Sequence, residues 1–229
     1  IAAVIVEPMS GSAGVIVPPK GYLDRLREIC TAHDILLIFD EVITAFGRSG
    51  ATTGAEAFGV TPDIMNVAKQ ITNGAVPMGA VIATGEIFDT FMHAGGAQHA
   101  IEFPHGYTYS AHPVACAAGL AALEMMEREN FPAQVNAIAP LFEQKLHALK
   151  GHNHIVDIRN YGLAGALQLA PRNGDPTIRP RDAHMALWEA GFYVRYGGDT
   201  LQFGPPFGTT EAELERLFDA VASTLDSLA

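Results

Sequence analysis

Two apolar runs that flank a helical stripe, near the start of the chain, constrain the fold more than any other feature. Residues 1–6 read Ile-Ala-Ala-Val-Ile-Val, and residues 35–39 read Ile-Leu-Leu-Ile-Phe. Continuous runs of this kind are typical of strands that are covered on both faces. Between the runs, apolar residues recur at steps of three and four from Leu23 to Cys30, which indicates an amphipathic helix. Strand, helix and strand in this order predict a βαβ crossover and a parallel sheet.

The pattern continues to about Asn130 and then changes. Residues 62–68 and 79–84 are expected to add short strands, and residues 112–129 a helix. After that point we expect helices near residues 133–149, 181–190 and 214–228, and strands near residues 154–159, 163–169, 192–196 and 200–203. Short strands mixed with helices are typical of a small α+β unit. We therefore expect an α/β protein with two domains, residues 1–130 and 131–229.

Composition excludes several classes of protein. The chain has 229 residues, with 14 Lys and Arg against 25 Asp and Glu, so its net charge is -11. An acidic balance argues against nucleic acid as a partner, because phosphate backbones require a basic face. No run of about 18 apolar residues is present, which argues against a membrane span.

Cysteine and histidine patterns argue against a metal and favour a reducing compartment. Cys30 and Cys116 lie far apart, so neither a zinc motif nor a disulfide framework is expected, and the cytoplasm is the expected location. Four histidines lie between residues 93 and 112 without the two-histidine helical spacing of a metal site. The apolar start lacks the basic leader of a signal peptide, and we expect the chain to be part of a longer protein.

An acid and an amine follow two of the expected strands. Asp40 and Glu41 end the second apolar run, and Lys69 follows a third. Ligands bind at the carboxyl ends of parallel strands. On position alone, Asp40 could equally cap its loop and Lys69 could be a solvated surface residue. A desolvated lysine can form a Schiff base with a carbonyl. Pyridoxal phosphate needs such a lysine, together with a carboxylate beside its ring nitrogen.

The surrounding residues resemble the class III aminotransferases. Three segments carry the resemblance, namely residues 36–42 with 46–50, residues 62–64 with 68–69, 73–74 and 77–81, and residues 106–110 with 112–118. The resemblance covers nearly the whole chain. Within the class, residues 193–200 are most similar to the ω-amino acid (β-alanine):pyruvate aminotransferases.

The resemblance implies roles for four residues around the cofactor. Lys69 would hold pyridoxal 5'-phosphate as a Schiff base and later carry a proton between substrate and cofactor. Asp40 would pair with the ring nitrogen. Val42 would pack against one face of the ring, with Ile43 beside it.

Three further residues receive roles from the same resemblance. Thr108 would bind the cofactor phosphate of a neighbouring subunit, so a homodimer or tetramer with a shared site is expected. Glu7 would lie near the site as an orienting carboxylate. Arg195 would bind the substrate carboxylate through two parallel hydrogen bonds. Residues 10–13 read Ser-Gly-Ser-Ala where many relatives carry a glutamate, which favours pyruvate as acceptor over a substrate of the γ-aminobutyrate type.

The resemblance also implies the fold and an incomplete site. The expected fold is the fold-type I transferase, with residues 1–130 as the C-terminal part of a large cofactor-binding domain. Only the second half of the family's sequence is represented, so this segment alone is predicted not to be an active transaminase. The expected reaction moves an amino group from an ω-amino acid such as β-alanine, or from an amine, to pyruvate. The alternatives are another class III enzyme such as an aminomutase, or an inactive chain that keeps the motifs.

Overall fold

The structure is a computed structural model that describes residues 1–100, 103 and 105–228. It forms two compact units. Unit 1 comprises Ile1–Pro8, Lys20–Phe46 and Thr53–Glu129, and unit 2 comprises Met9–Pro19, Gly47–Thr52 and Asn130–Ala229. The boundary between the two units therefore falls near residue 130. Two short loops from the first part of the sequence, Met9–Pro19 and Gly47–Thr52, also belong to unit 2.

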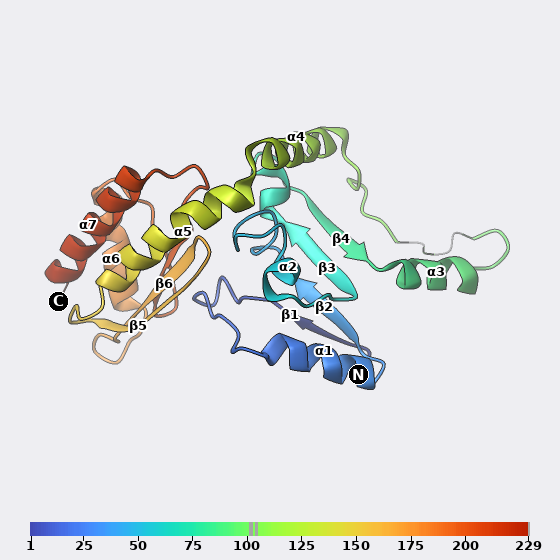
Figure 1. The fold of residues 1–229 in the computed structure, drawn as a ribbon, viewed down its shortest axis with the longest axis horizontal. Coiled ribbons are helices and arrows are strands. Elements are labelled where there is room, and N and C mark those ends of the chain that lie inside the picture. The colour runs from blue at the N-terminus through green and yellow to red at the C-terminus, as the bar shows by residue number, and fades with distance from the viewer. Residues whose placement is uncertain (101–102, 104, 229) are drawn as a thin grey trace. The chain divides into compact units, whose positions relative to one another are not determined.

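Unit 1 is built on a four-stranded sheet (Figure 1). Its strands are β1 (Ala3–Val6), β2 (Leu36–Asp40), β3 (Ile64–Ala68) and β4 (Gly79–Ala83), in the spatial order β1-β2-β3-β4. The helix α1 (Tyr22–Ala32) connects β1 to β2, and these two strands are parallel. The expected βαβ crossover is confirmed, and β3 also runs parallel to β2.

The fourth strand departs from the expected parallel sheet. β4 pairs antiparallel with β3, with Ala68 opposite Gly79. The connection is the 3-10 helix η1 (Lys69–Thr72) and a short loop, which is too short for the crossover that a parallel neighbour would need. The helices α2 (Gly54–Phe58) and α3 (Gly85–Ala94) were not predicted, whereas α4 (Pro113–Glu129) matches the expected helix.

The two faces of this sheet are covered differently. Register and pleat place Val4, Val6, Leu37, Phe39, Met65 and Val67 on the first face, and Ile5, Ile38, Asp40, Ile64, Asn66 and Val81 on the second. The first face packs against apolar residues of α1 and α2, such as Leu23 and Phe58. On the second face Ile5 is 58% exposed and Val81 is 70% exposed. The expectation that the first apolar run is covered on both faces is therefore not met in this chain.

Unit 2 is an antiparallel sheet packed against helices. The sheet contains β5 (Ile155–Tyr161), β6 (Ala164–Leu169), β8 (Thr200–Phe203) and β7 (Arg195–Gly197), in that spatial order. Its helices are α5 (Phe131–Ala148), α6 (Ile178–Glu189) and α7 (Glu211–Ser227). Buried side chains from α5, β6 and α7, such as Phe142, Leu167 and Phe218, form one core. The expected elements are confirmed, except that β7 begins at Arg195 rather than near residue 192.

Hydrogen bonds explain why two early loops belong to unit 2. In the loop 9–19, the carbonyl oxygen of Gly14 accepts a 2.9 Å hydrogen bond from Arg159 on β5. In the loop 47–52, the carbonyl oxygen of Gly50 accepts a 2.7 Å bond from Asn136 on α5. Such bonds between distant parts of the chain leave no periodic signal in the sequence. No helix in the described ranges is long and apolar enough to cross a membrane.

Candidate active site

The predicted acid and amine lie at the same edge of the unit 1 sheet. Asp40 is the last residue of β2, and Lys69 directly follows β3. The two strands are parallel, and Asp40 is paired with Asn66, three residues before Lys69. Both residues therefore stand at the carboxyl ends of neighbouring parallel strands, where α/β sheets bind ligands.

The carboxylate of Asp40 is oriented by the backbone that follows it. Its Oδ1 accepts a 3.1 Å hydrogen bond from the backbone N–H of Val42. The residue is half-buried on the less covered face of the sheet. Within the described ranges, Oδ2 accepts no hydrogen bond, so one oxygen is fixed and the other is available to a ligand.

Lys69 has an unusual backbone for a residue with a side chain. Its φ is 49°, in the left-handed region that costs a non-glycine residue free energy and is often found at functional sites. Asn73 closes the same turn with φ 51°, and its N–H bonds back to the carbonyl of Lys69. The Lys69 side chain is exposed, and within the described part of the chain its amine has no ion-pair partner.

Three more of the predicted residues follow strands of this sheet, namely Glu7, Val42 and Ile43. Glu7 directly follows β1, which pairs with β2 so that Val6 stands opposite Phe39. Glu7 and Asp40 are each the residue that follows this last pair of the register. Val42 and Ile43 belong to the turn after β2 and are half-buried. The sheet therefore brings together five of the predicted residues at one edge.

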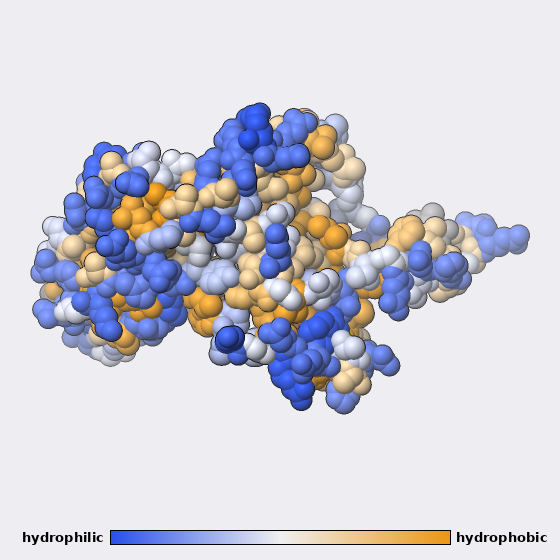
Figure 2. All heavy atoms as spheres, viewed as in Figure 1, coloured by the Kyte–Doolittle hydropathy of each residue, from blue (hydrophilic) through white to orange (hydrophobic). Residues whose placement is uncertain are grey.

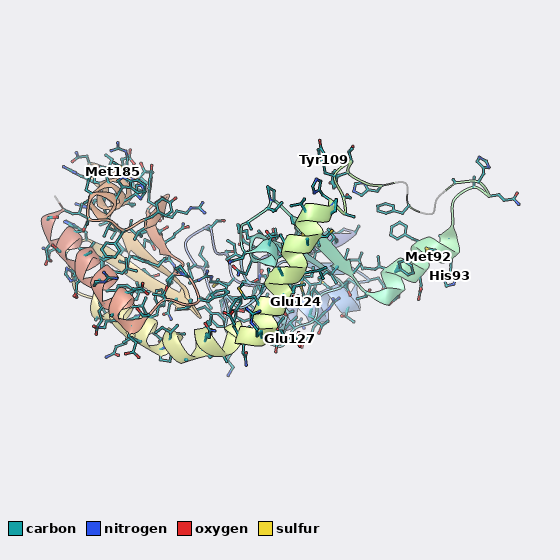
Figure 3. All side chains as sticks on the ribbon, turned by 90° about the horizontal axis from the view of Figure 1, so that it is seen from above. Met92, His93, Tyr109, Glu124, Glu127 and Met185 are labelled. Atoms are coloured by element: carbon teal, nitrogen blue, oxygen red, sulfur yellow. The ribbon has the colours of Figure 1, made fainter. Side chains whose placement is uncertain are left out.

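The third resembling segment forms its own cavity in unit 1. Residues 107 and 109–112 line a cavity of about 450 Å³ together with residues 76–79 and 115–116. The predicted phosphate ligand Thr108 lies in the same turn and is exposed. Tyr109 is 80% exposed, and Figure 3 shows it at the turn before α4. Segments 77–79 and 107–112, which are separate in the sequence, therefore meet in the fold.

Arg195, the predicted substrate ligand, belongs to unit 2. It begins β7 and pairs with Gln202 on β8. Its side chain is exposed and has no ion-pair partner within the described part of the chain. Gln202 donates a 2.9 Å hydrogen bond to the carbonyl oxygen of Ser12, so the loop 9–19 lies beside this hairpin. A free guanidinium of this kind can bind a carboxylate.

Arg48, in the first resembling segment, has a structural environment. Its guanidinium donates hydrogen bonds to the carbonyl oxygens of Leu163, at 3.0 Å, and Pro205, at 2.6 Å. It also lies over the ring of Phe207, 4.7 Å from the ring centre. Burial lowers the pKa of Arg48 to about 10. The side chain therefore ties its loop to unit 2.

Sequence reasoning named Glu41 without giving it a role of its own, and it missed Asn66. Glu41 is completely buried although it directly follows Asp40, and Asn66 is the strand partner of Asp40. A polar residue in the apolar run Ile-Met-Asn-Val-Ala was the available signal for Asn66. The structure contains no cluster of three or more histidine, cysteine, aspartate or glutamate residues suited to a metal within the ranges it describes.

Comparison with known proteins identifies the family. Residues 1–225 match the family described as aminotransferase class-III. The chain is 69% identical to a beta-alanine–pyruvate aminotransferase of Pseudomonas aeruginosa, covering 100% of this chain and 51% of that protein. It is 64% identical to an omega-amino acid–pyruvate aminotransferase of Pseudomonas putida, again over 100% of this chain and 51% of that protein.

Solved structures give the same result. The chain superposes on a PLP-bound amine transaminase from an uncultivated Pseudomonas species with a TM-score of 0.93 and 38% identity, covering 100% of this chain and 53% of that one. The fold is therefore that of the transaminases, as expected from the sequence. The chain belongs to the class III aminotransferase family. It spans about half the length of the curated relatives it matches.

Proposed function

We propose that this chain is the C-terminal half of an aminotransferase that uses pyridoxal 5'-phosphate. The reaction moves an amino group from an ω-amino acid such as β-alanine, or from an amine, to pyruvate. One observation carries the proposal. Asp40 and Lys69 stand at the carboxyl ends of two adjacent parallel strands, with Asp40 paired to Asn66. The high identity to two ω-amino acid–pyruvate aminotransferases supports the choice of substrates.

The residues at this edge fit the cofactor chemically. The cofactor carries an aldehyde, a basic ring nitrogen and a phosphate, and it supplies an electron sink for the substrate when bound. Lys69 offers an exposed amine for the aldehyde. Asp40 offers a fixed carboxylate, with one oxygen held by Val42, for the ring nitrogen. An acid and an amine at one sheet edge are the donor set that this group requires.

Each residue has a defined task in the proposed reaction. The carboxylate of Asp40 keeps the ring nitrogen protonated by pairing with its positive charge. Val42 and Ile43 restrict the ring from one side. The Nζ of Lys69 would hold the cofactor through its aldehyde, and as a free amine it would move a proton to and from the substrate carbon. Glu7, which directly follows β1, would act as an orienting carboxylate near the site.

Two residues contribute to binding rather than to proton transfer. Arg195 binds the carboxylate that pyruvate and β-alanine share, through two parallel hydrogen bonds. Thr108 binds the phosphate of a cofactor held by a neighbouring subunit, which makes the active species a homodimer or tetramer. The exposed turn at Thr108 supports this role.

The rest of the enzyme completes the site. β4 is an edge strand, and unit 1 exposes apolar side chains that soluble proteins normally cover. Figure 2 shows hydrophobic surface in the region of β3 and β4, and the exposed residues include Val81, Ile82, Phe88, Val114, Leu120 and Leu123. We infer that the N-terminal half and a second subunit cover these faces.

In this proposal, unit 1 is part of the large cofactor-binding domain and unit 2 is the small C-terminal domain. The location is the cytoplasm.

Replacement of Lys69 tests the function. The complete protein is purified with pyridoxal phosphate, beside its Lys69→Ala and Lys20→Ala variants. The wild type and Lys20→Ala, which changes another exposed lysine, are expected to show the visible absorbance of a lysine-bound cofactor and turnover with β-alanine and pyruvate. Lys69→Ala is expected to lose both. Persistence of absorbance and turnover in Lys69→Ala would refute the assignment, and turnover without any keto acid would instead indicate an aminomutase.

A further inference from the structure

Glu41 is a charged residue buried in the interior of unit 1, directly after Asp40. Its side chain has 0% exposure. The carboxylate accepts hydrogen bonds from the hydroxyl of Thr44 at 2.5 Å, from the backbone N–H of Gly54 at 2.6 Å and from that of Ala55 at 2.6 Å. A buried carboxyl group is costly unless donors surround it, and here three short bonds supply them.

The acidic pair Asp40-Glu41 is divided between the two faces of the sheet. Side chains alternate along a strand, so Asp40 lies on the less covered face while Glu41 turns toward the packed one. On the packed side it meets the beginning of α2, where two backbone N–H groups lack partners within the helix. The two acids are therefore neighbours in sequence with different surroundings.

Glu41 joins both ends of the segment that leaves the sheet edge. Thr44 lies three residues after it, and Gly54 and Ala55 lie at the return of the chain, so one carboxylate closes the segment 42–53. The fit is close, because a Cβ added at Gly54 would stand 2.9 Å from Oε2 of Glu41. A side chain at residue 54 would displace the carboxylate.

The backbone of Glu41 joins the two strands of the proposed site. Its N–H donates a 2.8 Å hydrogen bond to the carbonyl oxygen of Asn66, and its own carbonyl accepts a 3.0 Å bond from Ala45. Val42, which holds Oδ1 of Asp40, lies between Glu41 and Thr44. Glu41 therefore contacts Thr44 and Ala45, which follow Val42 in the same turn, through its side chain and its backbone carbonyl.

We propose that Glu41 is a positioning residue: by fixing the turn 42–45 it sets the orientation of the Asp40 carboxylate toward the ring nitrogen of the cofactor. The inference rests on the proposed function. It assigns to Glu41 no contact with cofactor or substrate. The isosteric amide cannot replace the carboxylate, since its NH₂ group would face a backbone N–H donor.

The test uses the complete enzyme loaded with pyridoxal phosphate. Glu41→Gln removes an acceptor, and Thr44→Val removes one donor at nearly constant volume. Thr44→Ser keeps the hydroxyl and serves as the matched control, and Glu28→Gln changes an exposed glutamate of the same unit. The dissociation constant of the cofactor and the pH midpoint of its visible absorbance are measured for each variant, beside the thermal midpoint.

Glu41→Gln is expected to raise the dissociation constant of the cofactor about tenfold, because a misplaced Asp40 carboxylate weakens one charged hydrogen bond to the ring nitrogen. The absorbance midpoint is expected to move to higher pH, because a ring nitrogen with a misplaced Asp40 draws less electron density from the bond to Lys69. Thr44→Val should move both quantities in the same direction by less, and Thr44→Ser and Glu28→Gln should leave them unchanged.

Unchanged affinity and absorbance midpoint in Thr44→Val and Glu41→Gln, with only the thermal midpoint lowered, would overturn the inference. If Glu41→Gln does not fold, the same two quantities are compared between Thr44→Val and Thr44→Ser. Equal dissociation constants and equal absorbance midpoints in these two variants would overturn the inference. Persistence of the visible absorbance and of turnover in Lys69→Ala would instead refute the proposed function. The two failures are therefore distinguishable.

Discussion

The backbone N–H of Glu41 donates a 2.8 Å hydrogen bond to the carbonyl oxygen of Asn66. This bond fastens the end of β2 to β3 one residue after Asp40 and three residues before Lys69. The separation between the acid and the amine therefore depends on ladder bonds within a sheet rather than on a flexible loop. Sites built on such elements hold their geometry well.

Asp40→Asn is expected to lower kcat of the complete enzyme about a hundredfold or more, because it removes a charge that stabilises the developing electron sink. The amide oxygen can still accept the hydrogen bond from Val42, so folding should be preserved. Steady-state kinetics with β-alanine and pyruvate measure the effect. Asp24→Asn, an exposed change on α1, is the control, and an Asp40→Asn enzyme with wild-type kcat would contradict the role.

Arg195→Ala is expected to raise KM for pyruvate and β-alanine by about ten- to a hundredfold, which corresponds to the loss of a charged pair of hydrogen bonds. KM for a simple amine without a carboxylate should change far less. Arg195→Lys keeps the charge but not the paired geometry. Its KM for pyruvate and β-alanine should lie between those of wild type and Arg195→Ala. Equal increases of KM for both kinds of donor would remove Arg195 from substrate binding.

Arg48→Met is expected to reduce the free energy of unfolding by about 2–4 kcal/mol, since two carbonyl oxygens lose a charged donor and Phe207 loses a cation–π contact. Both contacts are present in unit 2. Denaturant unfolding of the complete protein measures the loss. Arg181→Met changes an arginine whose side chain is 63% exposed and should cost little, so similar losses in the two variants would show that the Arg48 contacts carry no special stability.

Acid sensitivity is expected at the start of α7. The backbone N–H and the hydroxyl of Thr210 hold the pKa of Glu213 below its usual value of 4.5, as part of a capping box. A carboxyl group whose pKa is lower in the folded state stabilises the fold above its unfolded pKa, and this contribution is lost as the pH falls through the folded value. Wild type should therefore be more stable than Glu213→Gln at pH 6–7.

The difference in unfolding free energy between wild type and Glu213→Gln should shrink as the pH drops below about 4.5. Denaturant melts at several pH values measure it. Glu189→Gln, an exposed change at the end of α6, provides the comparison. A difference that stays constant from neutral to acidic pH would contradict the capping role.

Local patterns in the sequence predicted most of the elements. The periodicity of α1 and α7 and the apolar runs of β1 and β2 are properties of consecutive residues, and all four elements are present in the structure. The helix α2 was missed although its signal is local: Thr53 caps the N–H of Glu56 and Gly59 ends the helix. Five residues are too few for a periodic stripe to stand out from the surrounding glycine-rich loop.

Motifs and periodicity among consecutive residues were enough to predict the order of most elements along the chain and the family resemblance, and they suggested Asp40 and Lys69 as a pair. The antiparallel direction of β4, the open face that carries Asp40 and the burial of Glu41 became visible only in the folded chain. Strand pairing and burial depend on residues far apart in the sequence, such as Glu41 and Gly54, whereas motifs and periodicity depend on neighbours.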